Sequence, residues 1–196
     1  MSLPAPAPRT LLHTRKISFE GYLREDGLWD LDAELVDFKN HPIHMRERGD
    51  LAPGEPVHHM RIRVTVDDSL TITDIATVTE SAPFGECQAA VPPMEKLIGF
   101  KLGAGWRKAI EGAIGGVAGC THLRELLFNV ATAAFQTIPH HREQLREARG
   151  EPAADPSTPP HYLGKCMAWD FGGPVVQRLM PMFYRPRSAL PPETTP

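Results

Sequence analysis

Cysteine and histidine are the residue types in this chain with the widest chemical range. The 196-residue sequence has nine histidines and three cysteines. An odd number of cysteines does not form a closed disulfide framework, so in a reducing compartment they are expected to be free thiols, metal ligands or nucleophiles. The three are Cys87, Cys120 and Cys166.

Cys87 follows the segment APFGE (82–86), where a predicted strand gives way to a predicted helix. Thiols at helix N-termini have lowered pKa values, because the helix dipole and the free backbone N–H groups stabilise the thiolate. A reactive or metal-binding cysteine fits that position. A small residue buried at a strand–helix corner fits it equally well.

The segment GCTHLRELL (119–127) places Cys120 in the same kind of position, directly before the longest predicted helix. Thr121 can cap that helix through its hydroxyl. His122 lies in the first turn, where the helix dipole favours the neutral imidazole that serves as a metal ligand or a base. The alternative is that Cys120 belongs to the core and His122 is a surface residue at the helix cap.

A metal centre is one chemistry that these residues could support. A tetrahedral site needs four ligands, or three ligands and a water molecule. Thiolate and imidazole ligands suit zinc or iron, so one of these metals is the expected cofactor. The candidate ligands are Cys87, Cys120, His122 and Cys166.

Acid–base catalysis without a metal is the second chemistry. His13, His59 and Asp30 belong to two predicted β-hairpins and could supply a general acid and a general base. His58 and His59 open one strand, and alternation places His58 on the same face as Met60 and His59 on the other face. The alternative is that these are structural histidines and solvated hairpin charges, which contribute little to stability.

Two β-hairpins must position most of these side chains. Residues 16–39 alternate apolar and polar positions around the tight-turn pair Asp26-Gly27. Residues 58–79 alternate in the same way around a polar turn. Sequential strands joined by short turns predict a four-stranded antiparallel meander. The polar segment 40–56 between the hairpins is predicted to be a loop, either functional or mobile.

Three helices are predicted after the strands. Apolar residues recur at helical spacing in 94–98, around 106–110 and in 121–138. Pro139 is predicted to end the longest helix, with 140–149 as a polar helical extension. The predicted fold class is therefore α+β, a four-stranded antiparallel sheet covered on one face by about three helices.

Prolines divide the chain into ordered and flexible parts. The 20 prolines cluster near the two ends and in one internal stretch, and proline-rich polar segments cannot build a packed core. The predicted organisation is a flexible N-terminus (1–9), a single α+β domain (10–149), a proline-rich linker (150–160), a C-terminal segment that packs on the domain (161–184) and a flexible tail (185–196).

Composition argues against some classes of partner. The formal net charge is −3, and the basic residues form no stripe interleaved with aromatic residues, so nucleic acid is not an expected partner. The N-terminus lacks the apolar segment of a secretory signal, and no stretch is apolar enough for a membrane span. The expected location is the cytoplasm, with no membrane partner.

Several separated blocks agree in order with one known family. They are LLHTR (11–15), REDGLWD (24–30), HHMRIRVTVDD (58–68), the pairs AP and CQ at the two ends of 82–88, and GCTHLRELL (119–127). On these blocks the chain, from residue 10 to residue 185, resembles the bacterial family filed as domain of unknown function 2889. The resemblance implies a bacterial, cytoplasmic protein and carries no established activity with it.

A second resemblance is one of layout. An antiparallel strand pair, a cysteine loop, a helix and a cysteine that opens a long alanine-rich helix follow one another, as in the NifU and IscU iron–sulfur cluster scaffold proteins. This resemblance implies binding of zinc or a nascent cluster, with Cys120 in the place of the last cysteine and Cys87 near that of the first. The middle cysteine of those scaffolds has no counterpart in 100–119, and Ala89 stands where they have an aspartate.

Three functions stay open as alternatives. The first is a metal- or sulfur-handling, scaffold-like accessory protein that uses Cys87 and Cys120 as ligands or persulfide carriers. The second is a small-molecule enzyme of the lyase or hydrolase class that uses His13, His59 and Asp30. The third is a non-catalytic interaction module, such as a homodimer formed through the sheet face that the helices leave open.

Overall fold

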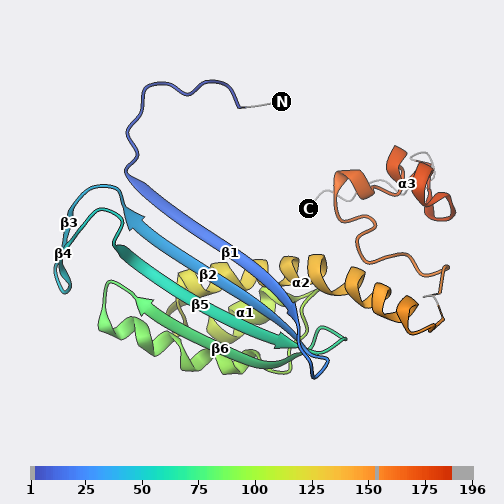
Figure 1. Ribbon diagram of the computed structural model, residues 1–196, viewed down its shortest axis with the longest axis horizontal. Helices are drawn as coiled ribbons and strands as arrows, with labels where there is room; N and C mark the ends of the chain where they lie inside the picture. The colour runs from blue at the N-terminus through green and yellow to red at the C-terminus, as the bar shows by residue number, and fades with distance from the viewer. Residues whose placement is uncertain (1–2, 153–154, 187–196) are drawn as a thin grey trace. The chain divides into compact units, whose positions relative to one another are not determined.

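The two predicted hairpins form one four-stranded antiparallel sheet in the computed structural model, which describes residues 3–152 and 155–186 (Figure 1). The order across the sheet is β1-β2-β5-β6. The strands are β1 (His13–Leu23), β2 (Trp29–Lys39), β5 (Pro56–Val66) and β6 (Ile72–Ser81). The predicted α+β class, with its antiparallel sheet and covering helices, is confirmed.

Alternation along the two central strands gives the sheet one buried face. Every second residue of β2 is buried, and β5 repeats the pattern on the same face. The apolar members of this row are Trp29, Leu31, Ala33, Leu35, Met60, Ile62, Val64 and Val66. Complete burial of one large apolar side chain stabilises the fold by about 1.5–3 kcal/mol, so this row fixes which face turns inward.

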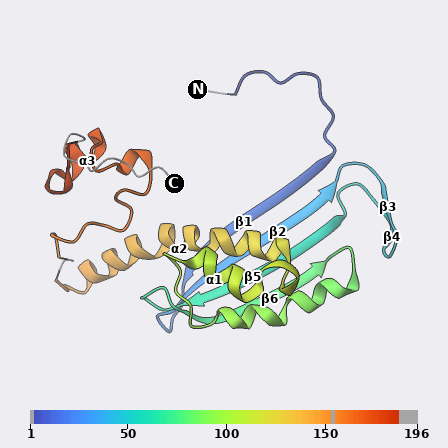
Figure 2. The same cartoon turned by 180° about the vertical axis from the view of Figure 1, so that it is seen from behind.

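Helices cover that buried face, as the two opposite views show (Figures 1 and 2). The 3₁₀ helices are η1 (Gly85–Ala90), η2 (Pro92–Leu97) and η3 (Gly116–Ala118), and the α-helices are α1 (Trp106–Ile114) and α2 (Thr121–Ala148). In α2 the buried residues recur at the predicted spacing of three and four. They are Leu123, Leu126, Leu127, Val130, Ala134 and Ile138.

The prediction that Pro139 ends the longest helix is wrong. Pro139 lies inside α2, which continues to Ala148 through the polar stretch. Proline removes one N–H donor and its ring crowds the carbonyl four residues earlier, at a cost of about 3 kcal/mol. Ile138, directly before the proline, is fully buried, so packing of the helix on the sheet holds the chain helical at this point.

The polar segment between the two hairpins is more ordered than predicted. It contains a short two-stranded sheet formed by β3 (Ile43–Met45) and β4 (Gly49–Leu51). Leu51 is buried, and the Lys39 carbonyl accepts a hydrogen bond from the Gly54 backbone N–H. These contacts tie the segment to the end of β2.

The chain divides into two compact units, Met1–Arg142 and Glu143–Pro196. The second unit holds the end of α2, the 3₁₀ helices η4 (Met167–Trp169) and η5 (Pro181–Phe183), and α3 (Pro174–Leu179). Within this unit Leu163 and Val176 are buried.

The predicted organisation into termini, linker and domain stays a prediction. The predicted tail at 185–196 lies outside the described residues except for its first two positions, and the first two residues of the predicted N-terminal segment are also outside them. In the described part of the chain, no helix combines the length and the apolar character that crossing a membrane requires.

Candidate metal centre

Asp37 is a charged residue at the end of the buried apolar row of β2. It is only 3% exposed and points to the helix-covered face, as Leu35 does two residues earlier. The strand register places Arg15 of β1 and His58 of β5 directly opposite it, one on each side. A register shift follows Asp37 in the pairing with β5, and such bulges redirect side chains near functional sites.

Two basic side chains of β1 hold the Asp37 carboxylate in place. The Arg15 guanidinium donates two hydrogen bonds, from Nε to Oδ1 and from a terminal nitrogen to Oδ2, both at 2.8 Å. His13 Nε2 lies 3.0 Å from Oδ1. The remaining terminal nitrogen of Arg15 donates to Glu125 of α2 at 2.6 Å, so the guanidinium also connects the sheet to the helix.

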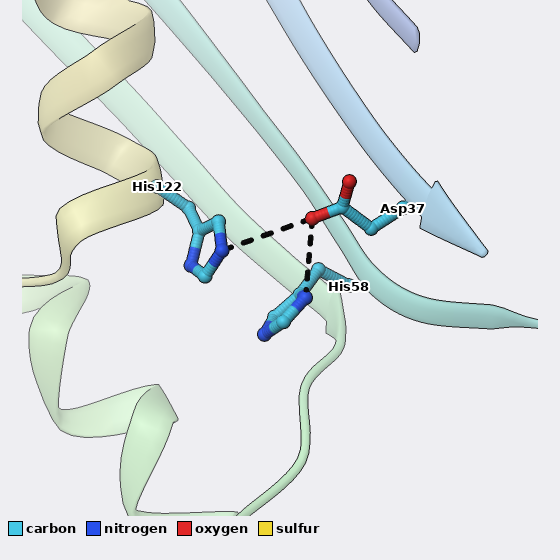
Figure 3. A group of neighbouring side chains, drawn as sticks. All are labelled: Asp37, His58 and His122. Carbon is cyan, nitrogen blue, oxygen red and sulfur yellow. Dashed lines mark ion pairs between the residues drawn. The ribbon is translucent and has the colours of Figure 1, made fainter. Parts of the chain in front are cut away.

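Two imidazole rings converge on the other side of the carboxylate (Figure 3). His58 Nδ1 lies 3.3 Å from Asp37 Oδ2, and His122 Nε2, from the first turn of α2, lies 3.7 Å from the same oxygen. The two rings are 3.9 Å apart between centroids and tilted by 33°. One ligand atom from each of the three residues lies within 4.8 Å of the other two, which is close enough for all three to hold one metal ion.

Electrostatics keep Asp37 and His58 in forms suited to a cation. Burial alone would raise the pKa of Asp37, but the hydrogen bonds and charges of Arg15 and His13 outweigh it and lower that pKa, so the carboxylate is ionised. Burial, with further contributions from the nearby His122 and Arg15, lowers the pKa of His58 and favours its neutral ring. Neutral imidazole and ionised carboxylate are the metal-binding forms of these side chains.

The His58 ring also contains an unsatisfied polar atom. Its Nδ1 is buried and makes no hydrogen bond of acceptable geometry, although the Asp37 carboxylate is near. Buried polar atoms in folded proteins almost always have a partner, so an orphan of this kind calls for an explanation such as an ion or a water molecule. The lone pair of a neutral ring at this position would be available to a metal.

Cys120 contacts the opposite nitrogen of His122. Its Sγ lies 3.8 Å from His122 Nδ1, and both side chains are half-buried at the start of α2. Burial opposes ionisation of the thiol, but hydrogen bonds from His122 and from the backbone N–H groups of Leu123 and His122 outweigh it and lower the pKa of Cys120. The hydrogen bond to Cys120 in turn outweighs burial and raises the pKa of His122.

The predicted metal ligands are only partly brought together. His122 belongs to the group around Asp37, and Cys120 contacts the ring nitrogen of His122 that points away from Asp37. Cys87 is half-buried in η1, and Cys166 is exposed in the second unit. Among the residues that the structure describes, no group of three ligand-type side chains close enough for one ion includes a cysteine.

The predicted acid–base residues lie in different places. His13 is beside Asp37 on the helix-covered face. His59 is on the open face between two carboxylates, 2.7 Å from Glu34 and 2.8 Å from Glu80. The residue paired with His59 on β2 is six positions from Asp30, so His59 and Asp30 are about 20 Å apart along the sheet.

The predicted ligand set contains His122 but neither Asp37 nor His58, the other two members of this group. The sequence carries a signal for each. Asp37 falls on the apolar row of β2, where a carboxylate must have partners because burying an unpaired charge is costly. His58 falls on the inner face, as its alternation with Met60 predicts. What the sequence lacks is the register that places these two opposite each other.

Comparison with known proteins adds one match. Residues 13–136 match the model of a family described as protein of unknown function (DUF2889). This range covers more than half of the chain and contains every residue around Asp37 described above. Neither the curated proteins nor the solved structures gave a match.

Proposed function

The chain belongs to the DUF2889 family of unknown function, and we propose that its Asp37, His58 and His122 side chains bind a divalent transition-metal ion. The observation that carries the proposal is the buried, unsatisfied His58 Nδ1 facing the same carboxylate oxygen as His122 Nε2. Metal–ligand bonds of about 2.0–2.1 Å in a tetrahedron separate neighbouring ligand atoms by about 3.3 Å. The separations of 3.3 Å and 3.7 Å are close to that value.

The ligand types favour zinc or ferrous iron. Two imidazoles and one carboxylate are typical of catalytic zinc sites and of non-haem iron sites that keep open positions. Calcium and magnesium prefer sites made of oxygen ligands, which the two imidazoles here do not provide. Three protein ligands leave at least one position for water or a substrate.

The residues behind the ligands would support the same role. Ligating carboxylates and imidazoles are usually oriented by further hydrogen bonds, and loss of such a bond costs about 10- to 100-fold in metal affinity. Arg15 and His13 hold the carboxylate, while the second lone pair of Asp37 Oδ2 stays available. Cys120 Sγ would accept a hydrogen bond from the Nδ1–H of a His122 that binds metal through Nε2. This arrangement supports a metal-handling role.

Metal content and affinity test the proposal. The protein purified without chelator should contain close to one zinc or iron per chain by elemental analysis. The metal-free protein should bind zinc in calorimetry, and His58→Ala and His122→Ala should each weaken binding by at least about 100-fold, because each removes a ligand. His44→Ala is the matched control, since His44 is an exposed histidine paired with Asp50 and should leave affinity unchanged. No uptake of zinc or iron by the wild type, or unchanged affinity in both ligand variants, would contradict the proposal.

A second candidate function is thiol chemistry at Cys120. Cys120, His122 and Asp37 form a line in which Sγ is 3.8 Å from Nδ1 and Nε2 is 3.7 Å from Oδ2. In cysteine-dependent enzymes a histidine activates the thiol and a carboxylate orients the histidine. The Cys120 thiolate would attack an electrophilic carbon or disulfide sulfur atom and displace its leaving group, which would take the proton of the His122 imidazolium. Asp37 would stabilise that imidazolium until the transfer.

Alkylation of the cysteines tests this second candidate. With iodoacetamide near neutral pH, Cys120 should react about tenfold or more faster than Cys87, which is also half-buried and serves as an internal control. His122→Ala should remove the difference, because the stabilising ring is lost. Peptide mass spectrometry would give the two rates. Equal rates in the wild type would count against thiol chemistry and leave the metal proposal intact.

A further inference from the structure

Strand β1 forms an open edge of the sheet. In the part of the chain that the structure describes, no strand lies beyond β1, and Figure 1 shows it at the border of the sheet. The strand pairs with β2 over all eleven residues without a register shift, so its outer edge is long and regular. Such an edge exposes a row of backbone donors and acceptors that another strand can pair with.

The opposite edge of the sheet is partly closed by the chain itself. At the start of β6, the Ile72 N–H donates to the Phe100 carbonyl, and the Gly99 N–H donates to the Ile72 carbonyl. Thr71 also forms an isolated bridge with Lys101. Among the described residues of the first unit, the edge of β1 lacks such a cover and exposes apolar side chains. They are Ile17, Tyr22 and Leu23, each more than 40% exposed.

The chain's own N-terminal segment is a poor partner for this edge. Pro4, Pro6 and Pro8 alternate in it, and proline has no N–H to donate to a neighbouring strand. Residues 3–10 are exposed and form no strand. A second copy of the chain is an alternative partner for this edge.

The sequence of β1 is complementary to itself in one antiparallel register. When two copies pair about a twofold axis at Ser18, Lys16 of each copy lies opposite Glu20 of the other, and Ile17 lies opposite Phe19. Two pairs of opposite charge and two apolar pairs then flank the axis, and cross-strand pairs of both kinds stabilise sheets. Gly21, which has no side chain, lies opposite the long side chain of Arg15.

The same register keeps the faces of the two sheets aligned. Side chains alternate between faces, so a register centred on a residue pairs even positions with even and odd positions with odd. The helix-covered faces of both copies then lie on one side of an eight-stranded sheet. We propose that the chain forms a homodimer by antiparallel pairing of β1 with β1 of a second copy, centred on Ser18.

Charge exchange tests both the dimer and its register. Lys16→Glu or Glu20→Lys places like charges opposite each other at two symmetric positions, so either change should raise the dimer dissociation constant by about tenfold or more. The double variant Lys16→Glu/Glu20→Lys restores both pairs and should dimerise like the wild type. Light scattering after gel filtration over a range of concentrations gives the dissociation constant. Lys108→Glu, an exposed charge reversal in α1, is the control.

A cysteine on the axis provides an independent readout. Ser18→Cys places two thiols directly opposite each other, close to the spacing of a disulfide, and should give a covalent dimer under mild oxidation. Thr14→Cys is the control, because residue 14 lies on the same face of β1 but the two copies of it are far apart in this register. Neither this variant nor the parent chain with its native cysteines should form a covalent dimer. A monomer at every concentration would overturn the proposal. The proposal would also be overturned by a dimer whose dissociation constant is unchanged by both charge reversals and which Ser18→Cys does not cross-link. Pairing of the β1 edge with a different protein would overturn it as well.

Discussion

Replacing Asp37 with alanine is expected to lower the free energy of unfolding by about 2–4 kcal/mol and to abolish metal binding. The carboxylate is buried and pairs by hydrogen bonds with Arg15 and His13. Its loss would leave the guanidinium without its buried partner, and breaking a buried pair in this way is costly. Arg15 keeps partial solvent access, which holds the cost below that of a fully buried pair. Urea unfolding measures the stability, and calorimetry measures the metal affinity.

Asp32→Ala is the matched control for this change. Asp32 lies on the same strand and also forms two hydrogen bonds with one guanidinium, that of Arg63, both at 2.7 Å. That pair lies on the open face, and more than half of the Arg63 side chain is exposed. Exposed pairs contribute about 1 kcal/mol or less, so Asp32→Ala should cost little and leave metal binding intact. Equal losses in the two variants would argue against a special role for Asp37.

The Asp37 carboxylate also gives stability a pH dependence of known sign. Its pKa is lower in the folded than in the unfolded protein, so its contribution is complete above the unfolded value, near 3.8. The contribution disappears as the pH falls through the lower folded pKa. The difference in unfolding free energy between wild type and Asp37→Ala should therefore shrink as the pH falls below about 4.

Gly21→Ala is expected to destabilise the fold by about 2–3 kcal/mol, because α2 crosses β1 at this glycine. A Cβ at Gly21 would lie 2.5 Å from Thr137 Cγ2 and 2.8 Å from Thr137 Cβ. Contacts this short force the helix and the strand apart, and overpacking of this kind costs about 1–3 kcal/mol. Thr137 itself is fixed by its hydrogen bond to the Ala133 carbonyl, which limits its ability to move aside. Thermal and urea unfolding would give the change.

Two further variants separate packing from backbone effects. In a Thr137→Gly background the added methyl no longer meets the Thr137 side chain, so Gly21→Ala should cost much less there, and the double-mutant cycle should show strong coupling. Gly112→Ala, at an exposed position of α1 with open space around it, should instead stabilise the protein by up to about 1 kcal/mol through helix propensity. An unchanged stability for Gly21→Ala would mean that α2 does not approach β1 this closely.

The sequence by itself determined the local structure of this protein. The apolar alternation of β2 and β5 and the turn at Asp26-Gly27 gave the two hairpins, because these signals act over neighbouring residues. The spacing of apolar residues after Thr121 gave the long helix in the same way. Pro139 shows the limit of such reasoning. A proline normally breaks a helix, but here the tertiary packing of Ile138 and its neighbours keeps the chain helical.

The candidate site was decided by tertiary structure. Asp37, His58 and His122 are far apart in the sequence, and two contacts that no local pattern encodes bring them together. One is the register between β2 and β5, which places Asp37 opposite His58. The other is the docking of α2, which carries His122 to the same oxygen. The position of His122 at the start of a helix made it a candidate ligand from the sequence alone. Only the packing of the helix on the sheet shows that Asp37 and His58 are the ligand-type residues grouped with it.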